Sequence, residues 1–200
     1  MKILLATDVY LPVINGVVTS VVNLRDQLRQ MGHDVRVLTL SNTGRFHQKE
    51  HIYYLGSVPV KIYPNARVSV ALFHPFVREI LRWRPDVVHT QTEFTTFFVS
   101  KQIAKKTGAL WVHTYHTLYE KYIHYFTKNC RLGQKFVANL SRMILSKVDG
   151  IVVPIHKVYE TLRDYGIAAR IYEVPTGICL ENFQQTLSLE QRTALRAALG

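Results

Sequence analysis

Short apolar segments alternate with segments of helical periodicity along almost the whole chain, and this alternation constrains the fold more than any other feature. The strand-like segments are 2–10, 34–40, 86–91, 109–117, 150–155 and 170–177, with shorter β-like pieces between 41 and 70. The segments with helical spacing are 19–31, 75–84, 93–107, about 132–147 and 155–165. Strands that alternate with helices in this way form a mostly parallel sheet. The sequence therefore predicts an α/β fold with a doubly wound, Rossmann-like sheet.

The composition fits one such domain and excludes several other classes of protein. The chain has 200 residues, of which 48% are apolar, enough for a substantial core. No apolar run approaches the roughly 20 residues that span a bilayer, and no leading apolar segment resembles a secretory signal. The two cysteines, Cys130 and Cys179, have neither metal-ligand nor disulfide spacing, which favours a reducing, cytoplasmic setting.

The charge is strongly basic, with 25 basic and 14 acidic residues and a net charge of +11. Such a surface attracts nucleic acid, an anionic membrane face or phosphorylated ligands, but no recognised nucleic-acid-binding motif is present. The basic stretches 75–84 and 121–147 have two interpretations. They are either core-packed helices with solvated basic faces, or an amphipathic surface that lies on anionic lipid. In the second case the expected membrane-contacting residues are Arg78, Arg82, Trp83, Lys135 and Arg142.

Ligands of a doubly wound sheet collect outside the carboxyl ends of its strands, and three loops with unusual contents fall there. The first, 10–19, contains Asn15-Gly16 at the start of a helix. Gly16 lets backbone amides approach a phosphate, and the helix dipole favours the anion. The alternative is that Gly16 is a turn glycine and Thr19 only an N-cap. The glycine pattern G-x-G-x-x-G is absent, so a dinucleotide cofactor is not expected.

The second loop, 89–95, follows the strand-like segment "DVVHT" and carries His89, Gln91 and Glu93. Strand alternation places His89 and Gln91 on one face of the sheet. Glu93 either reaches a ligand or, as its position alone favours, stabilises the first turn of the next helix.

The third loop lies within 111–126, where nine of sixteen residues are aromatic or histidine. His113 and His116 are three apart at a strand end and have no cysteine nearby, so a metal site is not expected. Core packing accounts for Trp111 and His113. It does not account for the polar-tipped residues that follow the strand, which suit a pocket for a polyhydroxy or lipid head group. These residues are His116, Tyr119, Tyr122 and Tyr125.

With these pieces in place, the sequence resembles the amino-terminal half of retaining GT-B glycosyltransferases. The matching stretches are "DVYLPVINGVVTSVVNLRDQLRQMGHDVRVLT", "PDVVHTQTEF", "VHTYHTLYEKYIHYF", "VDGIVVPIHKVYETLRDYG" and "VPTGICLENF". The combination of "HTQTEF" with "TYHTLYEKYIHY" is most similar to the bacterial diacylglycerol glucosyltransferases. The resemblance implies the fold of the N-terminal half of a GT-B enzyme.

The resemblance also implies roles for individual residues. Gly16 and Val17 match the backbone that meets the diphosphate of the donor, although Asn15 replaces a glycine usual in the family. His116 matches the histidine near the transferred sugar and is the expected catalytic residue. The expected acceptor-binding residues are Glu93, Tyr115, Tyr119 and Tyr122.

The tail from Ser188 begins with Ser188 and Gln191 in capping-box spacing and continues as a helix to the last residue. In the resembling family a second domain follows, with paired glutamates and the nucleotide pocket. We therefore expect an acceptor-binding domain at 1–183, and a linker and helix at 184–200 that lead to a further nucleotide-sugar-binding domain.

The resemblance implies transfer of glucose from UDP-glucose to diacylglycerol with retention, at the inner face of the plasma membrane, with no cofactor and no metal ion. Two alternatives remain open at this point. One is a glycosyltransferase that acts on a soluble polyol or sugar phosphate. The other is a non-catalytic module that binds anions or lipid.

Overall fold

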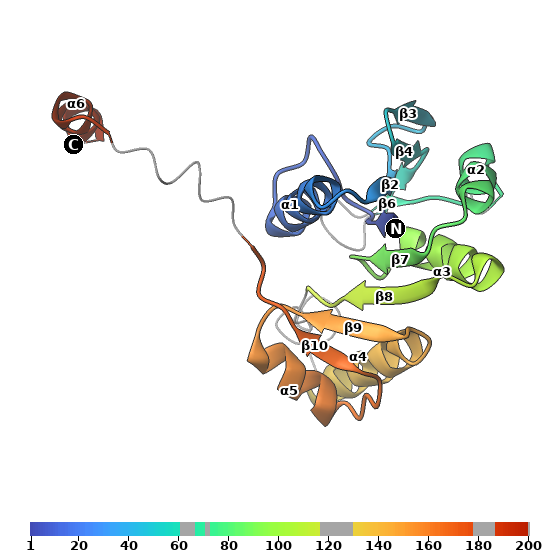
Figure 1. Cartoon of the computed structure of the whole chain (residues 1–200). Coiled ribbons are helices and arrows are strands. Elements are labelled where there is room, and N and C mark those ends of the chain that lie inside the picture. Colours follow the sequence, from blue (N-terminus) through green and yellow to red (C-terminus); the bar gives the residue numbers. More distant parts are fainter. Residues whose placement is uncertain (61–66, 71–72, 117–129, 178–186, 200) are drawn as a thin grey trace.

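A computed structural model describes residues 1–60, 67–70, 73–116, 130–177 and 187–199 (Figure 1). In chain order the strands are β1 (Lys2–Ala6), β2 (Asp34–Leu40), β3 (His47–Lys49), β4 (Ile52–Leu55), β5 (Val58–Pro59), β6 (Arg67–Val68), β7 (Val87–Thr90), β8 (Leu110–Thr114), β9 (Gly150–Val153) and β10 (Ile171–Glu173). The helices are α1 (Gly16–Gln30), α2 (Pro75–Trp83), α3 (Thr95–Thr107), α4 (Cys130–Leu145), α5 (His156–Asp164) and α6 (Leu189–Leu199).

Eight strands form one twisted sheet in the order β10-β9-β8-β7-β1-β2-β4-β3. Every neighbouring pair is parallel except β3–β4, which is antiparallel at the edge. The first strand lies between β2 and β7, so the strand order reverses beside β1, and such a reversal marks the usual place for a ligand. The predicted α/β, mostly parallel doubly wound fold is confirmed.

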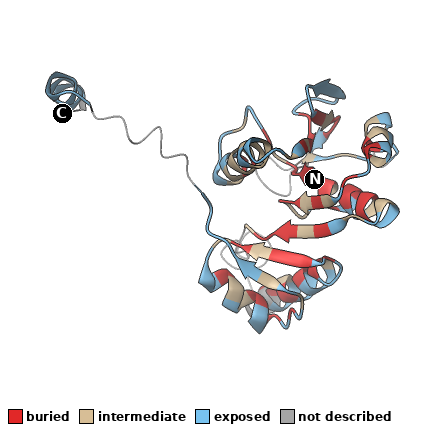
Figure 2. Cartoon of the chain, viewed as in Figure 1, coloured by how far each residue is buried: buried red, intermediate tan, exposed pale blue. Residues whose placement is uncertain are grey.

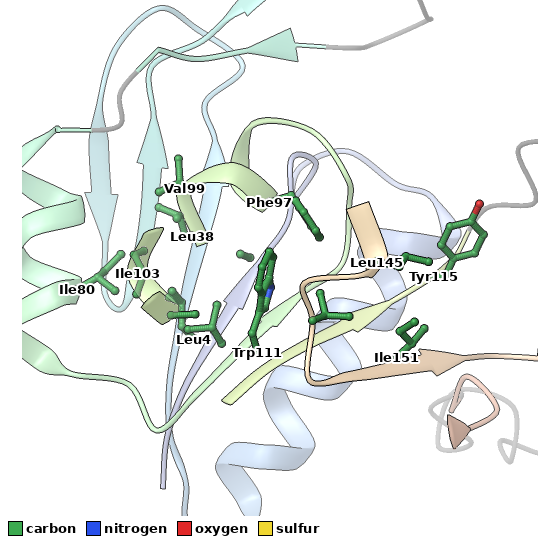
Figure 3. Packing of buried hydrophobic residues seen from close by; sticks show 14 of the residues in the cluster. Leu4, Leu38, Ile80, Phe97, Val99, Ile103, Trp111, Tyr115, Leu145 and Ile151 are labelled. Atoms are coloured by element: carbon green, nitrogen blue, oxygen red, sulfur yellow. The ribbon is translucent and has the colours of Figure 1, made fainter. Parts of the chain in front are cut away.

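The core has two parts, because residues on β1 and β2 alternate between the two faces of the sheet. Ile3, Leu5, Val35 and Val37 pack beneath α1. Leu4 and Leu38 face the opposite way, into the larger cluster that includes Ile80 of α2 and Ile103 of α3 (Figure 3). Buried residues therefore run along both faces of the central strands (Figure 2). The continuous apolar strands recognised in the sequence are what this two-sided burial requires.

The helix ends follow local signals in the sequence. Asn15 is the N-cap of α1, and its Oδ1 accepts a hydrogen bond from Val18 N at 2.9 Å. This assigns to Asn15 the capping role that the sequence offered to Thr19, which lies inside the helix. Gly32, at φ +82, follows the last turn of α1, where a left-handed conformation favours glycine. The capping box of α6 is also present, with Ser188 N donating to Gln191 Oε1 and Gln191 N donating to Ser188 Oγ.

Trp83 lies in the core, which corrects the expectation that it sits in a layer of lipid head groups. Its side chain is 8% exposed, and its Nε1 donates to Asp34 Oδ2 at 2.8 Å. The Arg36 guanidinium stacks on the indole at 4.4 Å from the ring centroid. The physical reason is that α2 turns its apolar stripe inward, so an aromatic residue in that stripe packs against the sheet while Arg78 and Arg82 remain exposed.

The described part of α4 has apolar side chains on two sides. Ala138 and Leu145 are buried, but Phe136 is 66% exposed and Met143 is 64% exposed. Phe136, Leu140 and Ile144 share helical spacing, but of these three only Ile144 packs against the core cluster. Leu140 is itself partly exposed, at 38%, so Phe136, Leu140 and Met143 form an outward apolar stripe on this helix.

We expect Trp83→Ala to lower the free energy of unfolding by about 3–5 kcal/mol, because it removes a buried indole and leaves a cavity. Arg82→Ala, one residue earlier and exposed, should change it by less than about 0.5 kcal/mol. Urea denaturation followed by circular dichroism measures both variants. Equal, small effects would contradict the burial of Trp83.

Candidate active site

Three strand ends meet at the carboxyl edge of the sheet, where β8, β7 and β1 are adjacent (Figure 1). The residues that follow these strands include most of those singled out in the sequence. Tyr119, Tyr122 and Tyr125 lie outside the described residues, so their proposed contacts are not addressed by the structure.

Asp8, just beyond β1, connects this strand to the start of α3. Its Oδ2 accepts hydrogen bonds from Thr92 Oγ1 at 2.5 Å and from Phe94 N at 3.2 Å, and its Oδ1 accepts from Thr96 N at 2.9 Å. The Asp8 amide in turn donates to Thr92 Oγ1 at 2.8 Å. The carboxylate therefore supplies the cap that α3 lacks from its own N-cap residue.

Burial raises the pKa of Asp8 above its usual 3.8, although the hydrogen bonds from Thr92, Thr96 and Phe94 oppose the shift. The unfolded chain then releases this proton at a lower pH than the folded chain. Protonation of Asp8 therefore favours the folded state. This contribution to stability is fully present below pH 3.8 and is lost as the pH rises through the raised pKa.

The role of Asp8 was not predicted from the sequence, where Glu93 was the acid expected at the first turn of this helix. The first turn of α3 contains no acidic residue, so the dipole of α3 is met by a residue 88 positions earlier in the chain. The available signal was an aspartate that ends an apolar strand at the ligand-binding edge. Its partner could not be identified, because the contact joins segments far apart in the sequence.

His116 and Gln91 form the central polar contact of this edge. The Nε2 of His116 lies 2.8 Å from Gln91 Oε1. Gln91 is only 2% exposed, and its backbone N donates to Ala6 O at 2.8 Å, which extends the ladder of β1 and β7. Burial lowers the pKa of His116 to about 4, against the opposing charge of Glu93. His116 is therefore a neutral imidazole at physiological pH.

A second polar contact lies one step further back along the same strands. His89 Nε2 is 2.7 Å from Thr114 Oγ1. Burial, and to a smaller degree the charges of His113 and His116, lowers the pKa of His89 to about 3. Contacts from His89 and Gln91 to alternate residues of β8 and its extension agree with the predicted placement of both residues on one face.

His113 points to the opposite face and is fully buried. Its Nδ1 is 2.9 Å from Thr90 Oγ1, and its ring packs edge-on against Phe97. The Nε2 of His113 lies 3.4 Å from Glu93 Oε1. The interpretation of His113 and Trp111 as core residues is confirmed. Glu93 lies beside the buried His113, and its charge also acts on His116.

Tyr115 was expected to line the acceptor pocket, and the structure places it in the core instead. It is 2% exposed, belongs to the larger hydrophobic cluster and lies with its hydroxyl 3.2 Å from Ser141 Oγ of α4 (Figure 3). Its ring packs inward because alternation along the extension of β8 gives Tyr115 the same side as His113.

The N-terminus of α1 is an open helix end at this edge. Asn15 accepts from Val18 N, and Thr19 N donates to Asn15 O. Among the described residues no hydrogen bond occupies the amides of Gly16 or Val17. Gly16 is exposed, and a Cβ built on it meets nothing within 4 Å. In contrast, Asp8 already occupies the amides of α3, so an anion would be accepted at α1.

An unsatisfied buried polar atom also lies at this edge. Within the described ranges, Gln91 Nε2 is buried and has no hydrogen-bond partner. Most buried polar atoms in proteins are hydrogen-bonded, so Gln91 Nε2 marks a place where a polar ligand or water completes the set. Across the same described residues, no three histidine, cysteine, aspartate or glutamate side chains are grouped closely enough to share a metal ion.

Comparison with known proteins identifies the family. The model of glycosyltransferase family 4 matches residues 14–182. The chain belongs to glycosyltransferase family 4. Among the family's relatives, the chain is 33% identical to the alpha-monoglucosyldiacylglycerol synthase of Streptococcus pneumoniae, over 100% of this chain and 46% of that protein. It is 31% identical to the synthase of the same name from Acholeplasma laidlawii, over 100% of this chain and 52% of that protein.

Solved structures of similar proteins support the fold of this family 4 chain. The catalytic domain of starch synthase IV from Arabidopsis thaliana superposes with a TM-score of 0.57 at 13% identity, over 100% of this chain and 59% of that chain. This likeness shows a shared GT-B-type half and, at such low identity, nothing more specific. The chain spans about half the length of the curated relatives it matches. No helix in the described residues has the length and apolar character to cross a membrane.

We expect Asp8→Ala to reduce the free energy of unfolding by about 2–3 kcal/mol, because the amides of Phe94 and Thr96 and the hydroxyl of Thr92 would lose their buried acceptor. Asp8→Asn keeps one acceptor oxygen and should lose about half as much. Asp26→Ala, at a partly exposed acid of α1 that pairs with Arg25, is the control and should change stability little. Hydrogen exchange at Thr96 would separate a local loss of the α3 cap from global destabilisation.

Proposed function

We propose that the protein containing this chain transfers glucose from UDP-glucose to diacylglycerol with retention, at the inner face of the plasma membrane. The observation that carries the proposal is the 33% and 31% identity, along the entire chain, to two proteins named alpha-monoglucosyldiacylglycerol synthase. The glucose of UDP-glucose is linked to phosphate through an α bond, so an α-linked product corresponds to retention of configuration.

In this proposal the donor diphosphate lies at the N-terminus of α1. The amides of Gly16 and Val17 would donate to its oxygens, and the helix dipole would stabilise the negative charge that grows as the diphosphate departs. The chemistry requires no metal ion in this scheme, because backbone dipoles and cations take that charge. These cations are proposed to belong to a second, nucleotide-sugar-binding domain, to which the segment 184–200 would lead.

His116 would contact the reacting sugar. As a neutral imidazole it can accept a hydrogen bond from a sugar hydroxyl through one nitrogen. Glu93, with a side chain 9% exposed beside His113, would hold an acceptor hydroxyl. Tyr119 and Tyr122 keep their proposed roles in acceptor binding. Tyr115 has no such role in this proposal, because it packs in the core with its hydroxyl beside Ser141.

The proposal is tested by incubating the intact protein with labelled UDP-glucose and vesicles that contain diacylglycerol. We expect an α-linked glucosyl lipid. Gly16→Ala should lower kcat/KM about tenfold to a hundredfold, because its methyl group would stand where the diphosphate approaches. Its melting temperature should be unchanged, since the added Cβ meets nothing within 4 Å. Gly44→Ala, which is equally unobstructed and lies in the β2–β3 loop, is the matched control and should keep full activity.

Two outcomes would replace the proposal. Transfer to a soluble polyol or sugar phosphate, with none to diacylglycerol, would indicate a soluble acceptor. Binding of anions or lipid by the intact protein without transfer to any acceptor would indicate a non-catalytic module.

The membrane surface in this proposal consists of Arg78 and Arg82 of α2 with Lys135 and the outward stripe of α4 (Phe136, Leu140 and Met143). All three cations are exposed, and each basic residue near an anionic surface contributes about 1 kcal/mol. Arg142 has a different role. Its Nε donates to Tyr165 O and its Nη1 donates to Asn139 Oδ1 at 2.6 Å, so it connects α4 to the end of α5.

We expect Phe136→Ser combined with Met143→Ser to weaken binding to vesicles rich in anionic lipid by about tenfold or more, because two exposed apolar side chains no longer enter the interface. Arg78→Gln, Arg82→Gln and Lys135→Gln together should remove the salt dependence instead. Met31→Ser with Phe46→Ser changes two other exposed apolar residues and serves as the control. Vesicle co-sedimentation at two salt concentrations measures all three proteins. Equal losses in all three would contradict the assigned surface.

A further inference from the structure

The contact between Gln91 and His116 determines which nitrogen of the imidazole carries the hydrogen. Gln91 Oε1 faces His116 Nε2 at 2.8 Å. A carbonyl oxygen only accepts, so this nitrogen of His116 must carry the hydrogen. Because a neutral imidazole holds one hydrogen, Nδ1 is then left as a bare acceptor. The side chain of one residue thus determines which atom of the other can receive a substrate hydroxyl.

We propose that Gln91 is the positioning residue for His116, holding its imidazole in the Nε2–H tautomer so that Nδ1 accepts a hydrogen bond from a sugar hydroxyl. This inference rests on the proposed function, since His116 is the residue that it serves.

Three features make Gln91 suited to this role. First, it is 2% exposed and continues the β1–β7 ladder through its backbone N, so it cannot easily move away from the contact. Second, an amide carries no charge, so it orients the imidazole without stabilising the imidazolium. Third, the remaining nitrogen of the Gln91 amide is buried and has no partner among the described residues, so a ligand oxygen at this edge would complete it.

A carboxylate at the same position would have the opposite effect. It would accept the same hydrogen bond but would attract a second proton to His116, and Nδ1 would then donate rather than accept. The other groups whose charge reaches His116 within the described residues are Glu93, which favours the imidazolium, and His113, which opposes it. His89 is the third histidine of this group. Because the amide is neutral, burial determines the protonation state of His116, and the imidazole remains uncharged.

The first experiment measures the tautomer directly and does not depend on activity. Selective ¹⁵N labelling of histidine in the intact protein allows the protonated nitrogen of His116 to be identified by NMR, with His116→Gln used to assign the signal. We expect the Nε2–H form in the native protein. Gln91→Met, which keeps the length of the side chain but removes the acceptor, should give a mixture of the two tautomers. A native Nδ1–H form, or an unchanged tautomer in Gln91→Met, would overturn the proposal.

The second experiment measures the pH dependence of transfer to diacylglycerol. Since burial lowers the pKa of His116 to about 4, kcat/KM should stay level from neutral pH downward and fall only as the pH approaches that value. Gln91→Met should reduce kcat about a hundredfold through misplacement of the imidazole, with little change in KM for UDP-glucose and no shift of the acidic limb. Gln91→Glu should move that limb towards neutral pH by more than about one unit.

The matched control is Thr114→Val, which breaks the neighbouring contact with His89 but leaves that between Gln91 and His116. It should lower the melting temperature while the acidic limb and the His116 tautomer stay unchanged. If Gln91→Met proves unfolded, the tautomer of the native protein and the acidic limb of Gln91→Glu still test the proposal. Equal pH profiles in the native protein, Gln91→Glu and Thr114→Val would overturn the positioning role. Absence of any transfer, with the tautomers as expected, would count against the proposed function alone.

Discussion

The arrangement of this domain depends on one buried carboxylate that joins the first strand to a distant helix. Asp8 binds the hydroxyl of Thr92 and the amides of Phe94 and Thr96, so it fixes the path of the chain between β7 and α3. That path carries Gln91 into the ladder beside β1 and directs its side chain towards His116. Because the same carboxylate occupies the N-terminus of α3, that helix end is closed to an anion, whereas the amides of Gly16 and Val17 at α1 are open to one.

The histidines of the resulting site are uncharged, although the chain is strongly basic. Burial keeps His89 and His116 neutral by lowering the pKa of each, and their partners Thr114 and Gln91 are uncharged. Neutral donors and acceptors suit the hydroxyls of a sugar, which would compete poorly for ionised side chains already paired with one another. In the proposed function, the negative diphosphate would instead be bound by backbone dipoles at Gly16, which carry partial charge without an ionised group.

The sequence predicted the order and type of the main elements, because their signals are local. Alternating apolar segments identified the parallel strands, and Gly32 and the pair Ser188–Gln191 marked helix ends through contacts a few residues long. It failed where a side chain has two possible faces or a distant partner. Helical spacing showed that Trp83 shared a stripe with other apolar residues but not that the stripe faces the sheet. Asp8 could not be matched to α3, because 88 residues separate it from Thr96.

The exposed position of the cations also explains why a net charge of +11 coexists with neutral histidines at the site. Exposed cations such as Arg78, Arg82 and Lys135 lie on helices that pack against the faces of the sheet, and they act over distances of about a Debye length. Such charge brings a domain to an anionic surface but cannot distinguish one hydroxylated acceptor from another. Discrimination needs short, fixed hydrogen bonds, which the buried pair of Gln91 and His116 can supply. In the proposed function, long-range attraction to the membrane and short-range selection of the acceptor would therefore belong to different residues of one fold.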